Sequence, residues 1–207
     1  MPKLLITGFL PWGPHAANSA CEVLRSINPS EFPEWKIERR EIPVSWSEVP
    51  SAIDACVKAT PDVFIALGQY QGNRIRLETT AHNRCDPNKA DVDGLFPTDS
   101  KIAETAPERL PTALPITEIE TELLKKQIPT QVSDDAGDYL CNYLFFHQML
   151  KAEESVSAGF IHLPLLTDWD LAKTKAAVET IVETTCDIAE RRLPAAEPPT
   201  TSSPTNA

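Results

Sequence analysis

The strongest constraint on the fold is a regular alternation of strand-like and helix-like segments at the start of the chain. Short apolar runs are typical of buried strands, and apolar residues at helical spacing predict helices between them. A strand–helix–strand–helix–strand order indicates a layered α/β fold with a largely parallel sheet. The five segments are 3–7, 20–27, 35–44, 52–59 and 63–67.

The rest of the chain breaks this rhythm. Residues 75–81 are predicted to be extended, and residues 83–115 form a long irregular stretch rich in Asp and Pro. A connection of this length inside a compact domain is usually functional or mobile. The remaining predicted elements are helices at 116–126, 138–151 and 168–192 and strands at 129–132 and 158–164. Candidate caps for three of the helices are Asn18 or Ser19, Ser45 or Ser47, and Thr167 or Asp168.

Length and composition fit one globular domain. The chain has 207 residues, of which 42% are hydrophobic and 24% charged, and this is ordinary for a single folded unit. Residues 194–207 contain four prolines, five serines or threonines and no aromatic residue. We therefore expect one domain over 1–193 and a disordered tail over 194–207.

Charge and cysteine usage exclude several classes of protein. The 19 basic and 30 acidic residues give a net charge of −11, which argues against nucleic acid and anionic membranes as partners. We find no apolar run of membrane-spanning length and no secretion signal, and expect a cytoplasmic protein. The five cysteines are scattered and include no CxxC pair. They fit neither a disulfide framework nor a zinc site, and we expect no metal and no cofactor.

Cys141 lies where a predicted helix begins. The small and acidic run 133–137 can cap that helix, which places Cys141 in its first turn or so. The helix dipole and the unpaired amides at this position favour an anion, so a thiol there is a candidate nucleophile. The alternative is an ordinary buried cysteine in a helix interface, and the segment by itself favours that alternative.

His162 is a polar ring inside an apolar strand. It lies near the end of the run 158–164, AGFIHLP. Active sites of open α/β sheets form at the carboxyl ends of strands, so this ring is a candidate base. The alternative is a core histidine whose hydrogen bonds are satisfied locally.

Four blocks of sequence resemble the type I pyroglutamyl peptidases, a family of cysteine peptidases also called pyrrolidone-carboxylate peptidases. They occur in the family's order, and the last two are the most specific. The blocks are ITGFLPWG at 6–13 with Asn18, LGQ at 67–69 followed by LE at 77–78 and AHN at 81–83, AGDYLCNY at 136–143, and AGFIHLP at 158–164.

The resemblance implies a fold and a catalytic set. The fold is a three-layer α/β/α sandwich with a mixed, mostly parallel central sheet, and the domain over 1–193 is then catalytic. The implied triad is Cys141, His162 and Glu78. Without the family, a solvated charge beside Arg74 and Arg76 is the simpler interpretation of Glu78.

The resemblance also implies a substrate pocket. Phe9, Trp12 and Gln69 stand where the family uses aromatic rings and a glutamine around a lactam ring. A flat neutral lactam suits such a pocket, since it offers one N–H, one C=O and otherwise apolar area. Core packing is the alternative interpretation of Phe9 and Trp12.

The implied activity is removal of N-terminal pyroglutamate from small peptides through a thioester acyl-enzyme. Homo-oligomers are common in the family, although no interface signature is evident in this sequence. Two alternatives stay open. One is a related cysteine hydrolase that acts on another N-blocked or lactam-like substrate. The other is a catalytically weakened or non-catalytic homologue that binds pyroglutamyl or lactam-like ligands.

One departure from the family concerns the charge near the nucleophile. Counting from Asn83, a family arginine falls on Asn88. In the family that arginine lies close to the nucleophile, so Asn88 is the oxyanion-side candidate here. It can donate a hydrogen bond but carries no charge. Lys89 or Arg84 could substitute from a neighbouring position.

Overall fold

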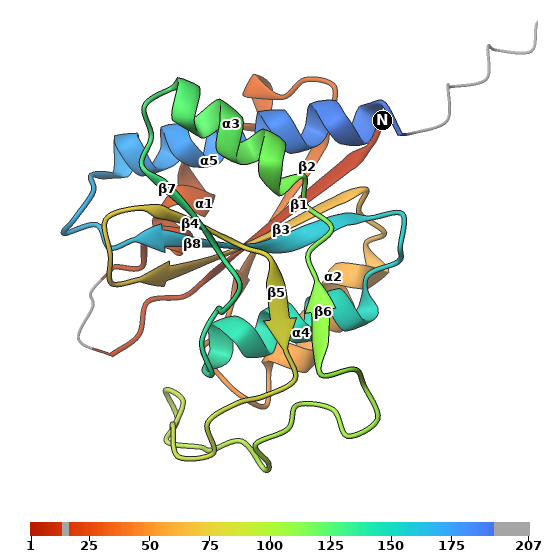
Figure 1. Cartoon of the computed structure of the whole chain (residues 1–207), viewed down its shortest axis with the longest axis vertical. Helices are drawn as coiled ribbons and strands as arrows, with labels where there is room; N and C mark the ends of the chain where they lie inside the picture. Colours follow the sequence, from red (N-terminus) through yellow and green to blue (C-terminus); the bar gives the residue numbers. More distant parts are fainter. Residues whose placement is uncertain (14–16, 193–207) are drawn as a thin grey trace, which may run out of the picture.

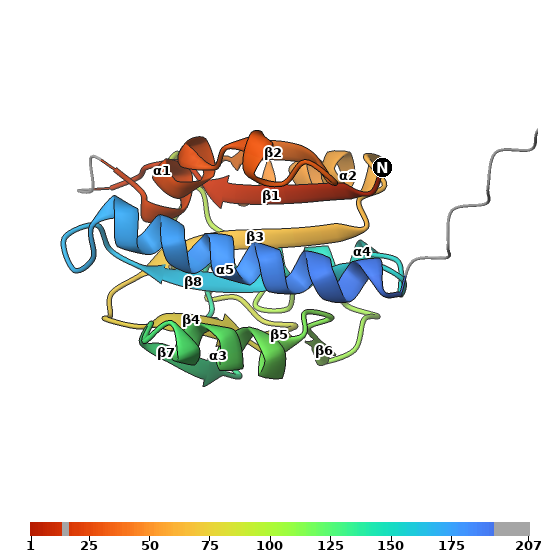
Figure 2. The same ribbon diagram turned by 90° about the horizontal axis from the view of Figure 1, so that it is seen from above.

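The structure is a computed structural model that describes residues 1–13 and 17–192. The strands of its main sheet are β1 (Lys3–Phe9), β2 (Lys36–Ile42), β3 (Val63–Tyr70), β4 (Ile75–Glu78), β7 (Thr130–Ser133) and β8 (Ser157–Pro164). They are ordered β2-β1-β3-β8-β4-β7; Figure 1 labels these strands, and Figure 2 shows their order from above. All neighbours run parallel except β4 and β8, which are antiparallel. The predicted tail over 194–207 lies outside the described residues.

Helices cover both faces of this sheet. They are α1 (Ser19–Ser26), α2 (Val49–Lys58), α3 (Ile116–Lys125), α4 (Leu140–Lys151) and α5 (Leu171–Glu190), with a 3-10 turn at Pro29–Glu31. Helices α1, α3 and α5 pack on one face and α2 and α4 on the other (Figures 1 and 2). This confirms the predicted three-layer α/β/α sandwich. Within the described part of the chain, no helix has the length and apolar character needed to cross a membrane.

The two cores follow from strand alternation. In β1, Leu4 and Ile6 join the core under α1, α3 and α5, whereas Leu5 and Phe9 join the core under α2 and α4. Successive side chains of a strand point to opposite faces, so one apolar strand supplies both cores. Close packing is required at Gly8, where a Cβ would lie 2.7 Å from the carbonyl oxygen of Ala20 in α1.

Two helix starts differ from the prediction. Helix α2 begins at Val49 after the N-cap residue Glu48 and has no side-chain cap, and the hydroxyls of Ser45 and Ser47 lie 3.1 Å apart, within hydrogen-bond distance of each other. Helix α5 is capped by Asp170, whose carboxylate accepts a hydrogen bond from the Lys173 amide at 2.7 Å. Several polar side chains precede each of these helices, and sequence alone does not tell which one reaches the free amides.

The extended segment predicted at 75–81 divides between two sheets. After β4 the chain leaves the main sheet and forms β5 (Thr80–His82), which pairs antiparallel with β6 (Arg109–Pro111). Strand β6 was not predicted, because three residues are too short to show a period. The loop between β5 and β6 is otherwise irregular, as predicted, and extends below α4 in Figure 1.

Candidate active site

Three neighbouring strands place polar groups on one face of the sheet. His162 in β8 is paired in register with Gly68 in β3 and with Arg76 in β4. Glu78 lies two residues after Arg76 and therefore points to the same face. The residues between them, Ile161 and Leu77, belong to the core on the opposite side. The imidazole and the carboxylate thus lie on the face that α4 covers.

Glu78 and His162 form a buried pair. The Nδ1 atom of His162 lies 2.7 Å from Oε1 of Glu78. The exposed fraction is 0% for Glu78 and 4% for His162, so the interpretation of Glu78 as a solvated charge is wrong. An ionised carboxylate can only accept, which means that Nδ1–H donates and Nε2 is the nitrogen left for proton transfer.

The surroundings favour the charged form of both groups. Burial opposes an imidazolium, but the charge and hydrogen bond of Cys141 and those of Glu78 raise the pKa of His162 to about 9. Burial would raise the pKa of Glu78, but the hydrogen bond and charge of His162, with smaller contributions from the Ser133 hydroxyl and the charge of Arg76, hold it below its ordinary value. Because the charge of Cys141 is among these causes, the imidazolium and carboxylate pair is the state favoured once His162 has taken the thiol proton.

Cys141 is the second residue of α4, as the sequence predicted within a turn. The cap differs from the expectation, because the N-cap is Tyr139 and makes no side-chain hydrogen bond to the helix. The acidic run instead folds on itself, with the Asp135 carboxylate accepting from the amide of Gly137 at 2.9 Å. Gly137 has φ +90°, a conformation that favours glycine. The first-turn amides are thus left uncapped and can face an anion.

Gly68 leaves room for the thiol. A Cβ on Gly68 would lie 3.1 Å from Sγ of Cys141 and 2.6 Å from the ring of Phe160. A side chain at this point of β3 would therefore press on the sulfur beside His162. Cys141 is half-buried, whereas the other four cysteines are buried. Among the described residues, it is the one thiol that combines access with a neighbouring imidazole.

The three predicted substrate-binding residues have different surroundings. Phe9 is buried in the core with α2 and α4, so core packing describes its ring. Trp12 is 37% exposed, and its ring centroid lies 5.4 Å from that of Tyr139, directly before α4. Gln69 follows Gly68, and its Oε1 accepts from the Ser19 amide at 3.1 Å. Trp12 thus lies at the start of the Cys141 helix, and Gln69 is fixed to the start of α1.

Asn88 is held within its own loop. It is exposed, and its backbone and side-chain amides donate to Oδ1 of Asp86 at 2.9 and 3.2 Å. No hydrogen bond joins it to Cys141, His162 or Glu78 among the described residues. An oxyanion-side role for this amide stays a prediction.

The two basic residues considered as substitutes are also engaged. Arg84 pairs with Asp135 at 2.8 Å, and Lys89 pairs with Asp138. Both carboxylates belong to the segment that leads into α4. Two ion pairs therefore attach the loop after β5 to this segment. Both cations already have a carboxylate partner.

Asn142 completes this attachment, although the sequence did not single it out. The side chain is completely buried, and its amide donates to the carbonyl oxygens of His82 and Arg84, both at 2.8 Å. Its oxygen accepts from the His82 amide at 2.9 Å. A polar residue directly after the candidate nucleophile, in an otherwise apolar helix, was the available signal.

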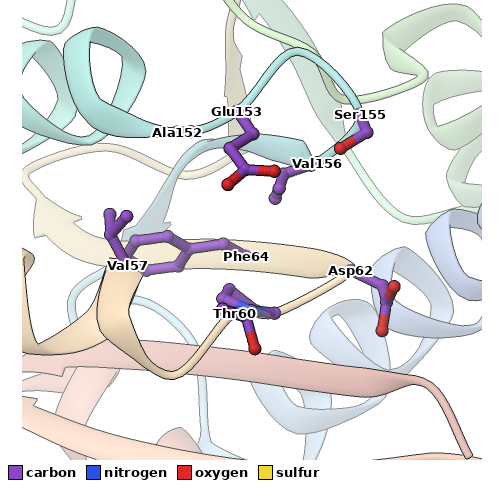
Figure 3. A pocket seen from close by; sticks show the side chains of 9 residues that line it. Val57, Thr60, Asp62, Phe64, Ala152, Glu153, Ser155 and Val156 are labelled. Atoms are coloured by element: carbon purple, nitrogen blue, oxygen red, sulfur yellow. The ribbon is translucent and has the colours of Figure 1, made fainter.

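A separate hollow lies at the other end of the sheet and carries no catalytic set. It has a volume of about 250 Å³ and opens where β3 and β8 begin, as Figure 3 shows. It holds no cysteine or histidine. Its lining is Val57, Thr60, Pro61, Asp62, Phe64, Ala152, Glu153, Ser155 and Val156. Within residues 1–13 and 17–192, no group of three or more His, Cys, Asp or Glu side chains is placed to hold a metal ion.

Comparison with known proteins agrees with this geometry. The sequence profile of the family described as pyroglutamyl peptidase matches residues 2–191. The chain belongs to the pyroglutamyl peptidase family. Pyrrolidone-carboxylate peptidase of Brevibacillus brevis is 35% identical over 191 residues, covering 88% of this chain and 89% of that protein. The enzyme of the same name from Thermococcus onnurineus is 35% identical over 188 residues, covering 87% and 94%.

Solved structures of pyroglutamyl peptidases share the fold. Pyrrolidone carboxyl peptidase from Thermococcus litoralis has a TM-score of 0.86 and 29% identity, covering 96% of this chain and 100% of that one. Pyroglutamyl peptidase I from Bacillus amyloliquefaciens has a TM-score of 0.81 and 27% identity, covering 89% and 94%. The resemblance found in the four sequence blocks is confirmed.

Proposed function

We propose that the protein is a cysteine exopeptidase that removes N-terminal pyroglutamate from peptides. The observation that carries the proposal is the buried Glu78–His162 pair beside the half-buried Cys141. Membership in the pyroglutamyl peptidase family supplies the substrate class. The three side chains come from β4, β8 and α4, and a set with these roles is what acyl transfer to a thiol needs.

The proposed reaction has two halves. His162 takes the thiol proton of Cys141, and the sulfur attacks the carbonyl carbon of the pyroglutamyl residue. The C–N bond breaks, and the imidazolium gives its proton to the leaving amine of the shortened peptide. His162 then takes a proton from water, whose oxygen attacks the thioester. The C–S bond breaks, the sulfur recovers a proton, and pyroglutamate leaves.

The remaining groups stabilise charge and position. Glu78 fixes the ring so that Nε2 is the nitrogen that exchanges protons, and its charge favours the imidazolium. The amides in the uncapped first turn of α4 are the donors proposed for the oxyanion. Asn88 is not needed in this scheme.

The lactam pocket is proposed at the start of α4. The exposed face of Trp12 beside Tyr139 offers a flat apolar wall. Gln69 offers its Nε2 group, since its Oε1 is occupied by the Ser19 amide. Phe9 shapes the pocket from the core below rather than contacting the ring through an exposed face.

A fluorogenic pyroglutamyl amide tests the proposal. We expect release of the fluorophore by the wild-type protein, and a loss of about 10⁴-fold or more in Cys141→Ala. Cys186→Ala, which changes a buried thiol in α5, is the matched control and should retain the rate. Release by Cys141→Ala at the wild-type rate would overturn the proposed nucleophile.

The same assay distinguishes the two alternatives. A related hydrolase would leave the pyroglutamyl amide intact and cleave an acetylated or differently ringed N-blocked amide in a Cys141-dependent way. A non-catalytic homologue would bind pyroglutamate, measured by calorimetry, without releasing product from any of these amides. The uncharged Asn88, tied to Asp86, is the observation that favours testing this last outcome.

Location and assembly belong to the same proposal. The predicted cytoplasmic location is supported by five cysteines that are all free thiols, as a reducing compartment maintains them. Self-association, which the resemblance implied, stays a prediction. Light scattering on the purified protein after size exclusion would give its mass in solution.

A further inference from the structure

Arg76 links the two halves of the proposed active site. Its Nε lies 3.3 Å from Oε1 of Glu78, as an ion pair. Its Nη2 donates to the hydroxyl of Ser133 and, at 2.8 Å, to the carbonyl oxygen of Asp135. Ser133 ends β7, and Asp135 lies in the segment that leads into the helix of Cys141. One guanidinium therefore contacts both the carboxylate behind His162 and the chain in front of the nucleophile.

The guanidinium is held in a fixed orientation. Its central carbon lies 5.3 Å from the ring centroid of Tyr70, whose hydroxyl donates to the carbonyl oxygen of Arg74 at 2.7 Å. The side chain of Arg76 is 25% exposed, so most of its surface is covered. A planar fork with five donors suits such a site better than a single ammonium group does.

The carboxylate of Glu78 depends on few contacts. Oε1 meets both His162 and Arg76, whereas Oε2 is buried and has no hydrogen-bond partner among residues 1–13 and 17–192. In the part of the chain that the structure describes, the charged or titratable groups that face Glu78 are His162 from β8, Arg76 from its own strand and Tyr70 from β3. Strand β7 contributes the neutral hydroxyl of Ser133.

Turnover makes the second cation necessary. When the imidazolium of His162 gives its proton to the leaving amine, the ring becomes neutral. Without Arg76, Glu78 would then be a completely buried carboxylate with no charged partner, which is strongly unfavourable. Arg76 takes no part in this proton transfer, and its guanidinium supplies a lasting positive charge beside Oε1 of Glu78. It keeps the carboxylate ionised during this step, so that Glu78 continues to accept the Nδ1–H hydrogen bond that orients the neutral ring.

We propose that Arg76 is a positioning residue, which keeps Glu78 ionised and aligned with His162 throughout turnover and ties the segment before Cys141 to the same strand. The inference rests on the proposed function for its catalytic consequence, but not for the contacts themselves. The arginine acts through Glu78 and does not touch the substrate.

Steady-state kinetics of Arg76→Gln test the inference. We expect kcat to fall by roughly 10- to 100-fold with KM little changed, because alignment is lost without a substrate contact. The acid limb of kcat/KM should move up by about one pH unit, since Glu78 loses a neighbouring cation. Arg74→Gln is the matched control, because it removes the same charge from an exposed residue two positions earlier. Its profile should match the wild type.

Arg76→Lys separates charge from geometry. We expect its acid limb to stay at the wild-type position because the charge is kept, whereas kcat is only partly restored because an ammonium lacks the fork. If Arg76→Gln does not fold, this variant decides the matter. A wild-type kcat in Arg76→Lys would then overturn the positioning role.

A carbon-13 titration of the Glu78 carboxyl tests the contact without any substrate. The signal is assigned by its loss in Glu78→Gln, and its pKa should rise in Arg76→Gln but not in Arg74→Gln. Equal titration and equal acid limbs in the two variants would overturn the inference. Failure of the proposed function would look different, because the wild-type protein would then release no fluorophore while the titration still differed.

Discussion

Two histidines lie along helix α4 in opposite surroundings. His162 projects from β8 toward the start of the helix, and its Nδ1 lies 2.7 Å from a buried carboxylate. His147 belongs to the helix itself, and both its ring nitrogens are buried without a hydrogen-bond partner among the described residues. The pKa of His162 is raised to about 9, whereas burial and the charge of Lys151 lower the pKa of His147 to about 4.

The difference teaches what makes a buried imidazole reactive. Burial disfavours the charged ring in both places. His147 has Asp54 in its vicinity, but that carboxylate is half-exposed and pairs with Lys151 at 2.5 Å. Glu78 is fully buried, and its negative charge stabilises the imidazolium of His162 at close range. His162 is therefore a candidate base because it has a buried carboxylate of its own. His147 has no such partner, and its ring packs edge-on against Tyr143.

The largest expected effect comes from removing that partner. Glu78→Gln keeps the volume but not the charge, and we expect kcat to fall by about 10³- to 10⁴-fold, as in other triads that lose their acid. The pKa of His162 should fall as well, measured from its ring resonances. Asp54→Asn makes the equivalent change beside His147 and should leave kcat unchanged. Equal kcat values in the two variants would show that the buried carboxylate does not distinguish His162 from His147.

A second change perturbs the thiol that faces His162. Gly68→Ala brings a methyl group within 3.1 Å of the Cys141 sulfur and closer still to the Phe160 ring. We expect a loss of roughly 10- to 100-fold in kcat/KM, because reacting groups displaced by about an ångström lose alignment. Circular dichroism should confirm that the fold is kept. A folded variant with wild-type kcat/KM would show that the sulfur tolerates the contact.

The two rings should also give opposite pH dependences of stability. An unfolded histidine titrates near pH 6.5. The lowered pKa of His147 contributes stability that is complete above pH 6.5 and lost as the pH falls toward 4. The raised pKa of His162 contributes stability that is complete below pH 6.5 and lost as the pH rises toward 9.

His147→Leu isolates the acid side of this profile. We expect the loss of unfolding free energy between pH 6.5 and 4 to shrink by on the order of 2 kcal/mol, with the alkaline side unchanged and activity retained. Urea unfolding at a series of pH values measures it. An unchanged acid slope would mean that the surroundings of His147 do not penalise its charge.

The smallest expected effect is that of Asn88→Arg. The residue is exposed and bonded to Asp86, so a new guanidinium there has a carboxylate at hand and no reason to reach the sulfur. We expect kcat/KM to stay within about twofold of the wild type. A gain of tenfold or more would show that the loop moves toward the nucleophile in solution, and that charge near His162 is not set by Glu78 alone.

Elements with a strong local period could be predicted from the sequence. The apolar run of β3 and the long amphipathic pattern of α5 fixed both elements to within a few residues. Strand β6 and the cap of α5 could not be predicted, because the first is decided by pairing with β5 and the second by which of several polar side chains reaches a free amide.

The site depended on information that is not local. Glu78 and His162 lie 84 residues apart, and two arginines near Glu78 make it look like a surface charge. Only the reversal of β4 relative to β8 brings the carboxylate under the imidazole. Resemblance to a family identified these residues, whereas the role of Arg76 required the cross-strand register and the contacts of its guanidinium.

The unequal burial of the five thiols means that a thiol reagent can distinguish folded from unfolded chains. Cys141 is half-buried, and burial raises the pKa of each of the other four. A maleimide added to the native protein should therefore stop at one label per chain, located at Cys141 by peptide mass. The other four sites are Cys21, Cys56, Cys85 and Cys186, and they should react only after denaturation. The ratio of fast to slow labelling would then report, in a single sample, the fraction of chains that are folded and hold an intact nucleophile.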